Sequence, residues 1–182
     1  DSVPGVTCEM EMLHFAVASP SRYLKTLARK SPTEVYGCKF LTYQMLEVNK
    51  IRDPRAFLDD LVADGFEIVH LIRRSFDQAF SLYAAQLVGK FKVEKGAKAE
   101  TTDIVFDKDT FIKQLRLSEA QLAWERSFMA YFDRIEVQYE RDLIGDATQQ
   151  QTIDRFCDHF GVARATVSAR VEKALSAKRT RV

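Results

Sequence analysis

Residues 67–86 read EIVHLIRRSFDQAFSLYAAQ, and this stretch decides the expected fold. Its first part, "EIVHLI" (67–72), is an apolar and β-branched run that is typical of a buried strand. The segment "SFDQAFSLYAAQLVG" (75–89) predicts a helix that ends at Gly89. Two arginines separate these elements. A strand that leads at once into a helix indicates a parallel sheet covered by helices on both faces.

The same alternation continues on both sides of this stretch. Further strands are predicted at 6–10, 34–41 and 134–140, and further helices at 19–30, 53–65, 108–131 and 148–177. Asp53 as the cap and Pro54 at the first position mark the start of the second of these helices. We therefore expect one three-layer α/β domain over residues 1–182, with a mainly parallel central sheet flanked by helices and a helical C-terminal part. The polar segment 90–103 is expected to be a mobile loop.

The charge is close to balanced, with 27 basic and 26 acidic side chains, so the sequence has no overall signature of binding to nucleic acid or to an anionic membrane. No apolar segment approaches the roughly 20 residues that span a bilayer. The three cysteines lie far apart without a Cys-x-x-Cys pair, which favours reduced thiols and a cytoplasmic location. The three scattered histidines lack the spacing of metal ligands, so we predict no metal site. His70 is expected to be a hydrogen-bonded core residue, and Trp124 is also expected in the core.

Arg73 directly follows the predicted strand at 67–72. In parallel sheets, ligands collect at the carboxyl ends of the strands, and the donors of a guanidinium suit a phosphate. The helix that begins near Ser75 adds free backbone N–H groups at the same place. Arg73 and Ser81 could then hold one phosphate from two sides. The alternative is that the arginines are solvated surface charges and that Ser81 bonds a carbonyl one turn back.

Arginine and serine at this spacing after an apolar strand resemble the 3′-phosphate-binding motif of sulfotransferases that use 3′-phosphoadenosine 5′-phosphosulfate. The segment "HLIRRSFDQAFSLYAAQ" (70–86) is similar to the same region of the bacterial carbohydrate and trehalose-type members. Four other segments resemble parts of that family in the family's order, namely "DSVPGVTCEMEMLHF" (1–15), "VYGCKFLTYQ" (35–44), "IEVQYERDL" (135–143) and "RFCDHFGV" (155–162).

The resemblance implies a P-loop nucleotide-binding-like fold and transfer of a sulfuryl group from 3′-phosphoadenosine 5′-phosphosulfate to a hydroxyl of a carbohydrate or glycolipid. It assigns Arg73 and Ser81 to the 3′-phosphate of the donor and Tyr139 to the adenine. It also assigns the basic tail with Arg179 to the phosphate site. A core tyrosine and a solvated charge run are the alternatives for these last two. The family's loop for the 5′-phosphosulfate is absent, so we expect it upstream of Asp1.

Sulfuryl transfer needs a base for the acceptor hydroxyl and cations near the leaving phosphate. Glu9 and Glu11 alternate along an extended segment and are expected on one side of it. The family's Gly-Glu pattern favours Glu11 as the base, with Glu9 second and His14 third; the alternative is a pair of exposed glutamates at a strand edge. The resemblance also places Lys39 near the bridging region of the donor, where the alternative is a lysine at a sheet edge.

Residues 152–175, "TIDRFCDHFGVARATVSARVEKAL", favour a different class of function. A helix, a Gly-Val turn and a second helix form the pattern of a DNA-binding helix-turn-helix. The residues that such a second helix would present to a major groove are Arg164, Thr166, Ser168 and Arg170. The near-neutral charge argues against this function, and the same arrangement is a common packing unit. A third interpretation is a sulfotransferase-like domain that binds ligands without catalysis.

Overall fold

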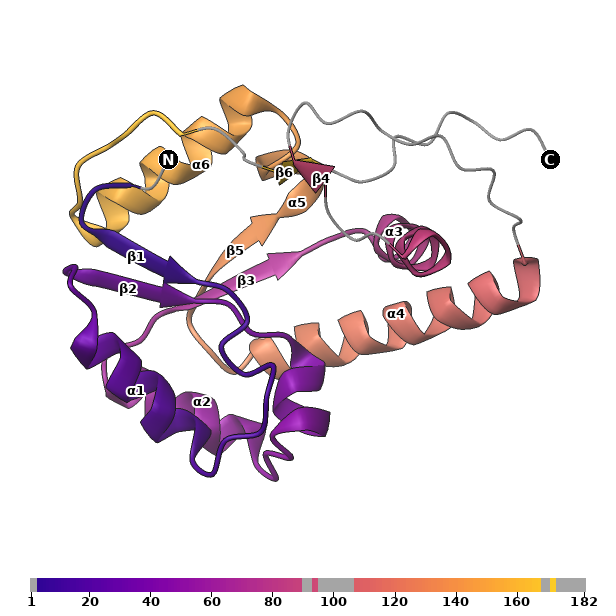
Figure 1. Ribbon diagram of the computed structural model, residues 1–182, viewed down its shortest axis with the longest axis horizontal. Coiled ribbons are helices and arrows are strands. Elements are labelled where there is room, and N and C mark those ends of the chain that lie inside the picture. Colours follow the sequence, from indigo (N-terminus) through magenta and orange to yellow (C-terminus); the bar gives the residue numbers. More distant parts are fainter. Residues whose placement is uncertain (1–2, 90–92, 95–106, 168–170, 173–182) are drawn as a thin grey trace.

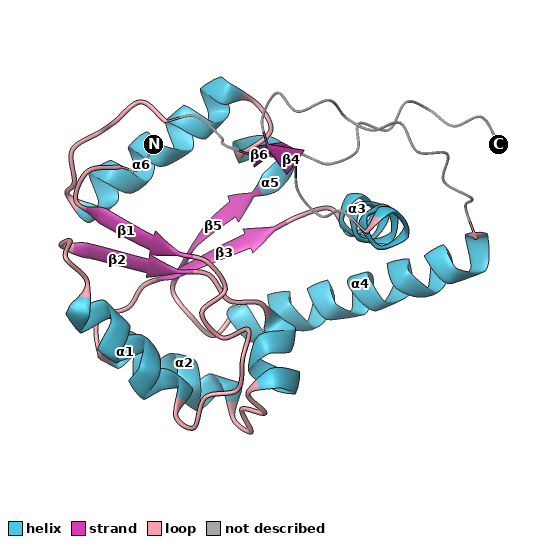
Figure 2. Ribbon diagram, in the orientation of Figure 1, coloured by secondary structure: helices cyan, strands magenta, loops and turns pink. Residues whose placement is uncertain are grey.

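The computed structural model describes residues 3–89, 93–94, 107–167 and 171–172. In this part the chain is mixed α/β, and strands alternate with helices along most of its length (Figure 1, Figure 2). The strands are β1 (Val6–Glu9), β2 (Val35–Cys38), β3 (Ile68–Ile72), β4 (Val93–Glu94), β5 (Arg134–Gln138) and β6 (Val171–Glu172). The helices are α1 (Pro20–Lys30), the π-helical η1 (Gln44–Val48), α2 (Pro54–Ala63), α3 (Ser75–Val88), α4 (Lys108–Met129), α5 (Tyr139–Asp142) and α6 (Asp146–Phe160).

The parallel pairing predicted from the sequence is present, but the single central sheet is not found among the described residues. β1 pairs in parallel with β2, and β3 pairs in parallel with β5, each as a separate two-stranded sheet. β3 was predicted to be buried on both faces, yet Val69 and Leu71 are 45% and 51% exposed. Only one face of this strand is therefore buried, the face that carries His70 and Ile72.

Local signals place several helix ends close to their predicted positions. The Asp53 carboxylate accepts a hydrogen bond from the Ala56 N–H at 2.9 Å and so caps α2. Gly89 ends α3 with a φ of 70°, a backbone conformation that glycine adopts without strain. α1 and α4 also lie inside their predicted ranges. η1 was not predicted.

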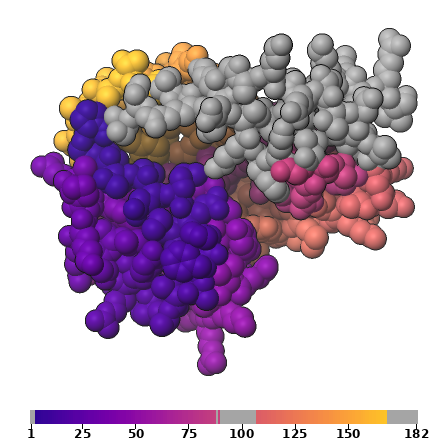
Figure 3. Space-filling view, in the orientation of Figure 1, coloured from indigo at the N-terminus to yellow at the C-terminus, as the bar shows by residue number. Residues whose placement is uncertain are grey.

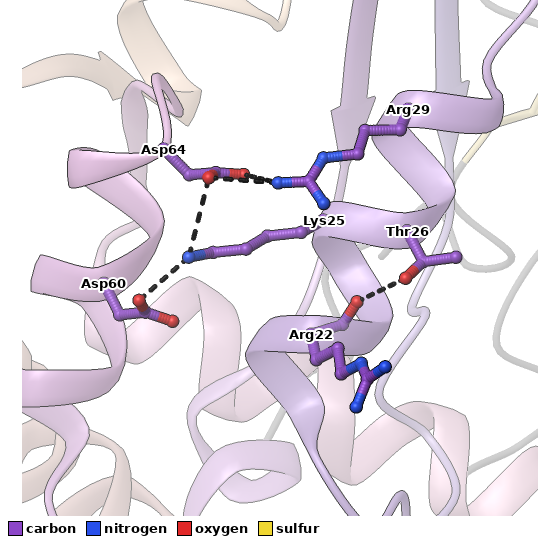
Figure 4. A network of polar contacts seen from close by, with 6 residues as sticks. All are labelled: Arg22, Lys25, Thr26, Arg29, Asp60 and Asp64. Carbon is purple, nitrogen blue, oxygen red and sulfur yellow. Dashed lines mark hydrogen bonds and ion pairs between the residues drawn. The ribbon is translucent and has the colours of Figure 1, made fainter.

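The main hydrophobic core lies around α1, α2 and η1. Its buried members are Leu13, Leu24, Met45, Phe57, Leu58, Leu61 and Phe132. Lys25 of α1 pairs with Asp60 at 2.8 Å, and Arg29 pairs with Asp64 at 3.3 Å (Figure 4). Exposed pairs of this kind contribute little stability, so apolar packing holds α1 to α2. In the face shown in Figure 3, this N-terminal part fills one side of the molecule.

A smaller apolar cluster packs α3 against α4. Its buried members are Ala79, Tyr83 and Phe111, with Phe80 and Leu115 packed beside them. The Tyr83 hydroxyl accepts the backbone N–H of Asp107, the residue that caps α4. This contact helps to hold α4 against α3, and α3 begins directly after the loop that carries Arg73.

The C-terminal region departs from the prediction of a helix over 148–177. α6 ends at Phe160, residues 162–167 form no helix, and Val171–Glu172 is a strand. The Gln150 side chain donates to the Ala165 carbonyl at 2.9 Å and accepts the Val167 N–H at 3.0 Å. These bonds take backbone groups that a second helix would need, so that helix is not formed over 162–167. Most of the predicted loop at 90–103 lies outside the described residues, apart from β4.

Candidate functional site

Arg73 lies at the carboxyl end of β3, in the loop that leads into α3. β3 ends at Ile72 and α3 begins at Ser75, so two residues make the connection. Arg74 is the N-cap of α3, with an extended backbone and no capping hydrogen bond from its own side chain. The first N–H groups of a helix carry partial positive charge. They therefore add to the positive charge of the two arginines in this loop.

The structure brings together three of the residues assigned to the donor nucleotide. Arg73 Nη2 donates a hydrogen bond to Ser81 Oγ at 2.8 Å. The Arg73 guanidinium also lies over the Tyr139 ring, 4.8 Å from its centre. Ser81 comes from the second turn of α3 and Tyr139 from the end of β5, which pairs with β3. A guanidinium that is both stacked and hydrogen-bonded presents its remaining donors in a defined direction.

Glu140 completes this group, and sequence reasoning missed it. Its Oε1 lies 3.9 Å from Arg73 Nε and accepts the Arg74 backbone N–H at 3.1 Å. The Glu140 side chain is 7% exposed. In the described structure, its Oε2 and Arg73 Nε have no hydrogen-bond partner. A buried carboxylate therefore offsets part of the Arg73 charge. The signal that could have found it is the position of Glu140 two residues after Gln138, the partner of Ile72 in the sheet.

A second polar cluster lies just after β1 and β2. Lys39 Nζ donates to Glu11 Oε1 at 3.3 Å, and Gln44 Nε2 donates to Glu11 Oε2 at 3.4 Å. His14 Nδ1 lies 2.6 Å from the backbone oxygen of Glu11. Two other candidate catalytic residues therefore contact Glu11. Lys39 binds its carboxylate, and His14 contacts its backbone oxygen.

Gln44 is the member of this cluster that the sequence did not indicate. It is fully buried, and its Oε1 accepts the Leu41 N–H at 2.9 Å. That bond turns the amide nitrogen towards Glu11 and towards the Tyr43 hydroxyl, each 3.4 Å away. A buried amide with all these partners holds the Glu11 carboxylate in one orientation. Its position in η1, an element with no sequence signal, explains why it was missed.

The Glu9 side chain lies apart from this cluster, although the Glu9 backbone oxygen accepts the Lys39 N–H at 2.9 Å. Its Oε2 accepts a hydrogen bond from the Tyr36 hydroxyl at 2.6 Å. Burial, together with this hydrogen bond, raises the pKa of Tyr36. The alternation from which a shared face with Glu11 was predicted does not hold, because β1 ends at Glu9 and Glu11 has a left-handed backbone with a φ of 55°. Side chains alternate only along an extended segment.

Three other predicted residues have different outcomes. His70 is buried as predicted, but neither ring nitrogen has a hydrogen-bond partner within the described residues, so the predicted hydrogen bonding is wrong. Burial lowers the pKa of His70. Trp124 is 39% exposed and stacks on Phe128 at 4.9 Å, so it lies at the margin of the core rather than inside it. Arg179 lies outside the described residues.

Comparisons of the chain with protein-family models, with curated proteins and with solved structures find no match. Within the described ranges, no group of three or more His, Cys, Asp or Glu side chains is placed to hold a metal ion. None of the helices in those ranges is both long and apolar enough to cross a membrane. A functional assignment therefore depends on the two side-chain clusters that follow the parallel strands.

Proposed function

We propose that this chain is a sulfotransferase that transfers a sulfuryl group from 3′-phosphoadenosine 5′-phosphosulfate to a hydroxyl of a carbohydrate or glycolipid. The observation that carries the proposal is the 2.8 Å hydrogen bond between Arg73 and Ser81 at the carboxyl end of β3. An arginine, a hydroxyl and the start of a helix form a common binding arrangement for phosphate. The Tyr139 ring, 4.8 Å from the guanidinium, offers an aromatic surface beside them.

The residues of this loop fit the 3′-phosphate of the donor nucleotide. The Ser81 hydroxyl accepts from Arg73 and keeps its own proton to donate to a phosphate oxygen. Glu140 orients the guanidinium but also opposes the charge of a phosphate. The donor, when bound, supplies the sulfuryl group and a stable leaving group, adenosine 3′,5′-bisphosphate.

Glu11 is the base in this proposal. Its carboxylate takes the proton of the acceptor hydroxyl while the hydroxyl oxygen bonds to sulfur and the bond from sulfur to the leaving phosphate oxygen breaks. Lys39, 3.3 Å from Glu11, supplies positive charge near the transferred group. Glu11 follows β1, Lys39 follows β2 and Arg73 follows β3. Each cluster therefore lies at the carboxyl ends of its own pair of parallel strands.

We infer a cytoplasmic location from the thiols. Cys8, Cys38 and Cys157 are all free. Burial raises the pKa of Cys38 to about 11, so this thiol stays protonated and weakly reactive at neutral pH. Reduced cysteines are typical of that compartment.

The nucleotide site is tested by calorimetry with adenosine 3′,5′-bisphosphate and adenosine 5′-monophosphate. We expect the 3′-phosphate to add affinity, and we expect Arg73→Ala to lose about 1.5–3 kcal/mol of it, or about 10- to 150-fold in Kd. Arg52→Ala, which removes an exposed arginine before α2, is the matched control. Equal affinity of the unaltered protein for the two nucleotides would overturn the proposed site.

Transfer is tested by following the release of adenosine 3′,5′-bisphosphate from the sulfated donor with and without oligosaccharide acceptors. Release that depends on the acceptor supports the enzyme. Nucleotide binding without any release supports the alternative of an inactive binding domain. The DNA-binding alternative is disfavoured, because residues 162–167 do not form the helix that it requires.

A further inference from the structure

A pocket of about 350 Å³ with both polar and apolar walls lies at the Arg73 loop, between the start of α3 and α4. Its walls include the apolar Leu115 and Leu122 and the polar or aromatic Arg74, Phe76, Glu119 and Arg126. The pocket adjoins the proposed donor site, because Arg73 lines it, but Ser81, Tyr139 and Glu140 do not. The proposed donor site uses Arg73 and assigns no role to the other residues that line the pocket.

The charges in this pocket favour an anion. Arg74 and Arg126 line it from different elements, and in the described part of the chain neither guanidinium has an acidic partner. Glu140 accepts the backbone N–H of Arg74 and not its guanidinium, so the Arg74 side chain is available to a ligand. Together with the start of α3, these two guanidinium groups outweigh the single carboxylate of Glu119, and Arg73, which also lines the pocket, adds to the positive charge. Guanidinium groups bind carboxylate, sulfate and phosphate through paired hydrogen bonds.

The pocket also has an aromatic wall, formed by Phe76. The Phe76 side chain is 56% exposed. Its ring contacts Phe111 edge-on at 5.5 Å and stacks with Phe80 at 6.4 Å. An aromatic ring that is exposed but held in place offers a flat apolar surface to a ring-shaped ligand. Glu119, on the opposite element, can accept hydrogen bonds from hydroxyl groups.

We propose that this pocket binds an acidic sugar of the acceptor, that is, a sugar ring that carries a carboxylate, sulfate or phosphate. Arg74 and Arg126 hold the anionic group, Phe76 packs against the ring, and Glu119 accepts hydrogen bonds from the ring hydroxyls. The volume is at the small end of ligand pockets, which run from about 300 to 1,000 Å³, and suits a single ring. This inference rests on the proposed function in treating the sugar as the acceptor, and it narrows the acceptor to an acidic glycan.

The test is an NMR titration of the full chain with glucuronic acid, glucose 6-sulfate and glucose 6-phosphate, with neutral glucose as the reference. We expect the acidic sugars to bind at least about tenfold more tightly than glucose, and Arg126→Ala to remove most of that difference. Arg116→Ala removes the same charge from an exposed position of α4 that does not line the pocket, and should change nothing. Phe76→Ala should weaken the binding of acidic and neutral sugars alike. Inorganic phosphate should bind more weakly than glucose 6-phosphate, because it lacks the ring.

Equal binding of glucose and glucuronic acid would overturn this proposal, as would an Arg126→Ala protein that binds acidic sugars normally. Inorganic phosphate that binds as tightly as glucose 6-phosphate would overturn it too, since the ring would then contribute nothing.

Calorimetry with adenosine 3′,5′-bisphosphate separates the pocket from the proposed donor site. We expect Ser81→Ala to weaken the nucleotide and to leave the acidic sugars unaffected, and Arg126→Ala to do the reverse. If Arg126→Ala weakened the nucleotide instead, the pocket would belong to the donor and this inference would be wrong. If acidic sugars bound as expected and no nucleotide did, the sugar pocket would stand and the sulfotransferase proposal would fall.

Discussion

The Arg73 guanidinium and the Ser81 hydroxyl are joined by a hydrogen bond of 2.8 Å that links the end of β3 to the second turn of α3. A loop arginine is thereby held by the helix that follows it. Tyr139 and Glu140, which follow β5, close the group from another element. The guanidinium is oriented before a ligand arrives, which reduces the conformational freedom that binding must remove.

We expect Glu140→Gln to raise the affinity of the protein for adenosine 3′,5′-bisphosphate. The change keeps an oxygen that can accept the Arg74 N–H but removes a negative charge 3.9 Å from Arg73 Nε. A gain of about 1–2 kcal/mol corresponds to about 5- to 30-fold in Kd. The Tm should fall in the same variant, because breaking a largely buried charge pair costs up to about 3–5 kcal/mol. Calorimetry is the measurement, with exposed Glu34→Gln as the control, and weaker binding by Glu140→Gln would contradict the phosphate site.

We expect Glu11→Gln to lower the turnover rate by about 10²- to 10⁴-fold, which is the usual contribution of a general base. Nucleotide affinity should stay nearly unchanged, because Glu11 lies in the cluster after β1 and β2 and has no contact with Arg73 or Ser81. The amide can still accept a hydrogen bond from Lys39. Loss of this exposed ion pair costs at most about 1 kcal/mol, so the fold should be retained. Steady-state rates and nucleotide calorimetry on the same preparation check both expectations.

Glu9→Gln and His14→Ala are the matched arms of this experiment. The Glu9 carboxylate accepts from the Tyr36 hydroxyl rather than from the Lys39 ammonium, so its substitution should have a much milder effect on the rate. His14 touches only the backbone of Glu11 through its Nδ1, and its loss should also be mild. If all three variants turned over an acceptor at a near-normal rate, the base would lie elsewhere and this segment would be structural.

We expect the free energy of unfolding to fall as the pH drops below about 6.5, the ordinary pKa of histidine, and we assign part of that fall to His70. Burial lowers the pKa of His70 in the folded chain. Glu125 and Glu136 act in the opposite direction. Arg134 and Arg126 reinforce the effect of burial. Below about pH 6.5 the unfolded chain therefore binds a proton that the folded chain does not, so stability is complete above this pH and is lost as the pH falls.

His70→Leu should flatten this dependence in urea unfolding measured across the same pH range, by at most about 1.4 kcal/mol per pH unit. It should leave stability near neutral pH unchanged or higher, because in the described structure both ring nitrogens are buried without a partner and each such group costs about 1–3 kcal/mol. His159→Gln, at an exposed histidine, is the control. If the pH dependence of stability were unchanged in His70→Leu, groups other than His70 would be responsible for the loss of stability at low pH.

Short-range signals account for the parts of the fold that could be predicted. Asp53 and Pro54 mark the start of α2, and Gly89 marks the end of α3, because caps and left-handed glycines act on neighbouring residues. The meeting of Arg73 and Ser81 is of the same kind. A strand end, a two-residue loop and two helical turns have nearly constant dimensions, so a spacing of eight residues returns the serine to the strand end.

The sequence-based predictions failed in two situations. In one, a side chain distant in the sequence changed the local backbone, and in the other, a strand face expected to be buried is exposed. The second helix expected after Gly161 is replaced by a segment that Gln150 holds through the backbone of Ala165 and Val167. β3 has the composition of a strand that is buried on both faces, yet Leu71 is exposed. A one-dimensional apolar run carries no information about how many layers will pack against it.

The amino-acid sequence by itself determined most of the helices, the near-neutral charge and the unit of strand, arginine and helix that places Ser81 beside Arg73. Only the tertiary structure decided what surrounds that unit. Gln44 meets Glu11 across 33 residues, and Glu140 meets the Arg74 backbone across 66. Arg126 of α4 lines the same pocket as this loop. These contacts arise from strand pairing and helix packing, which sum many weak interactions between distant segments, and no local pattern of residues encodes that sum.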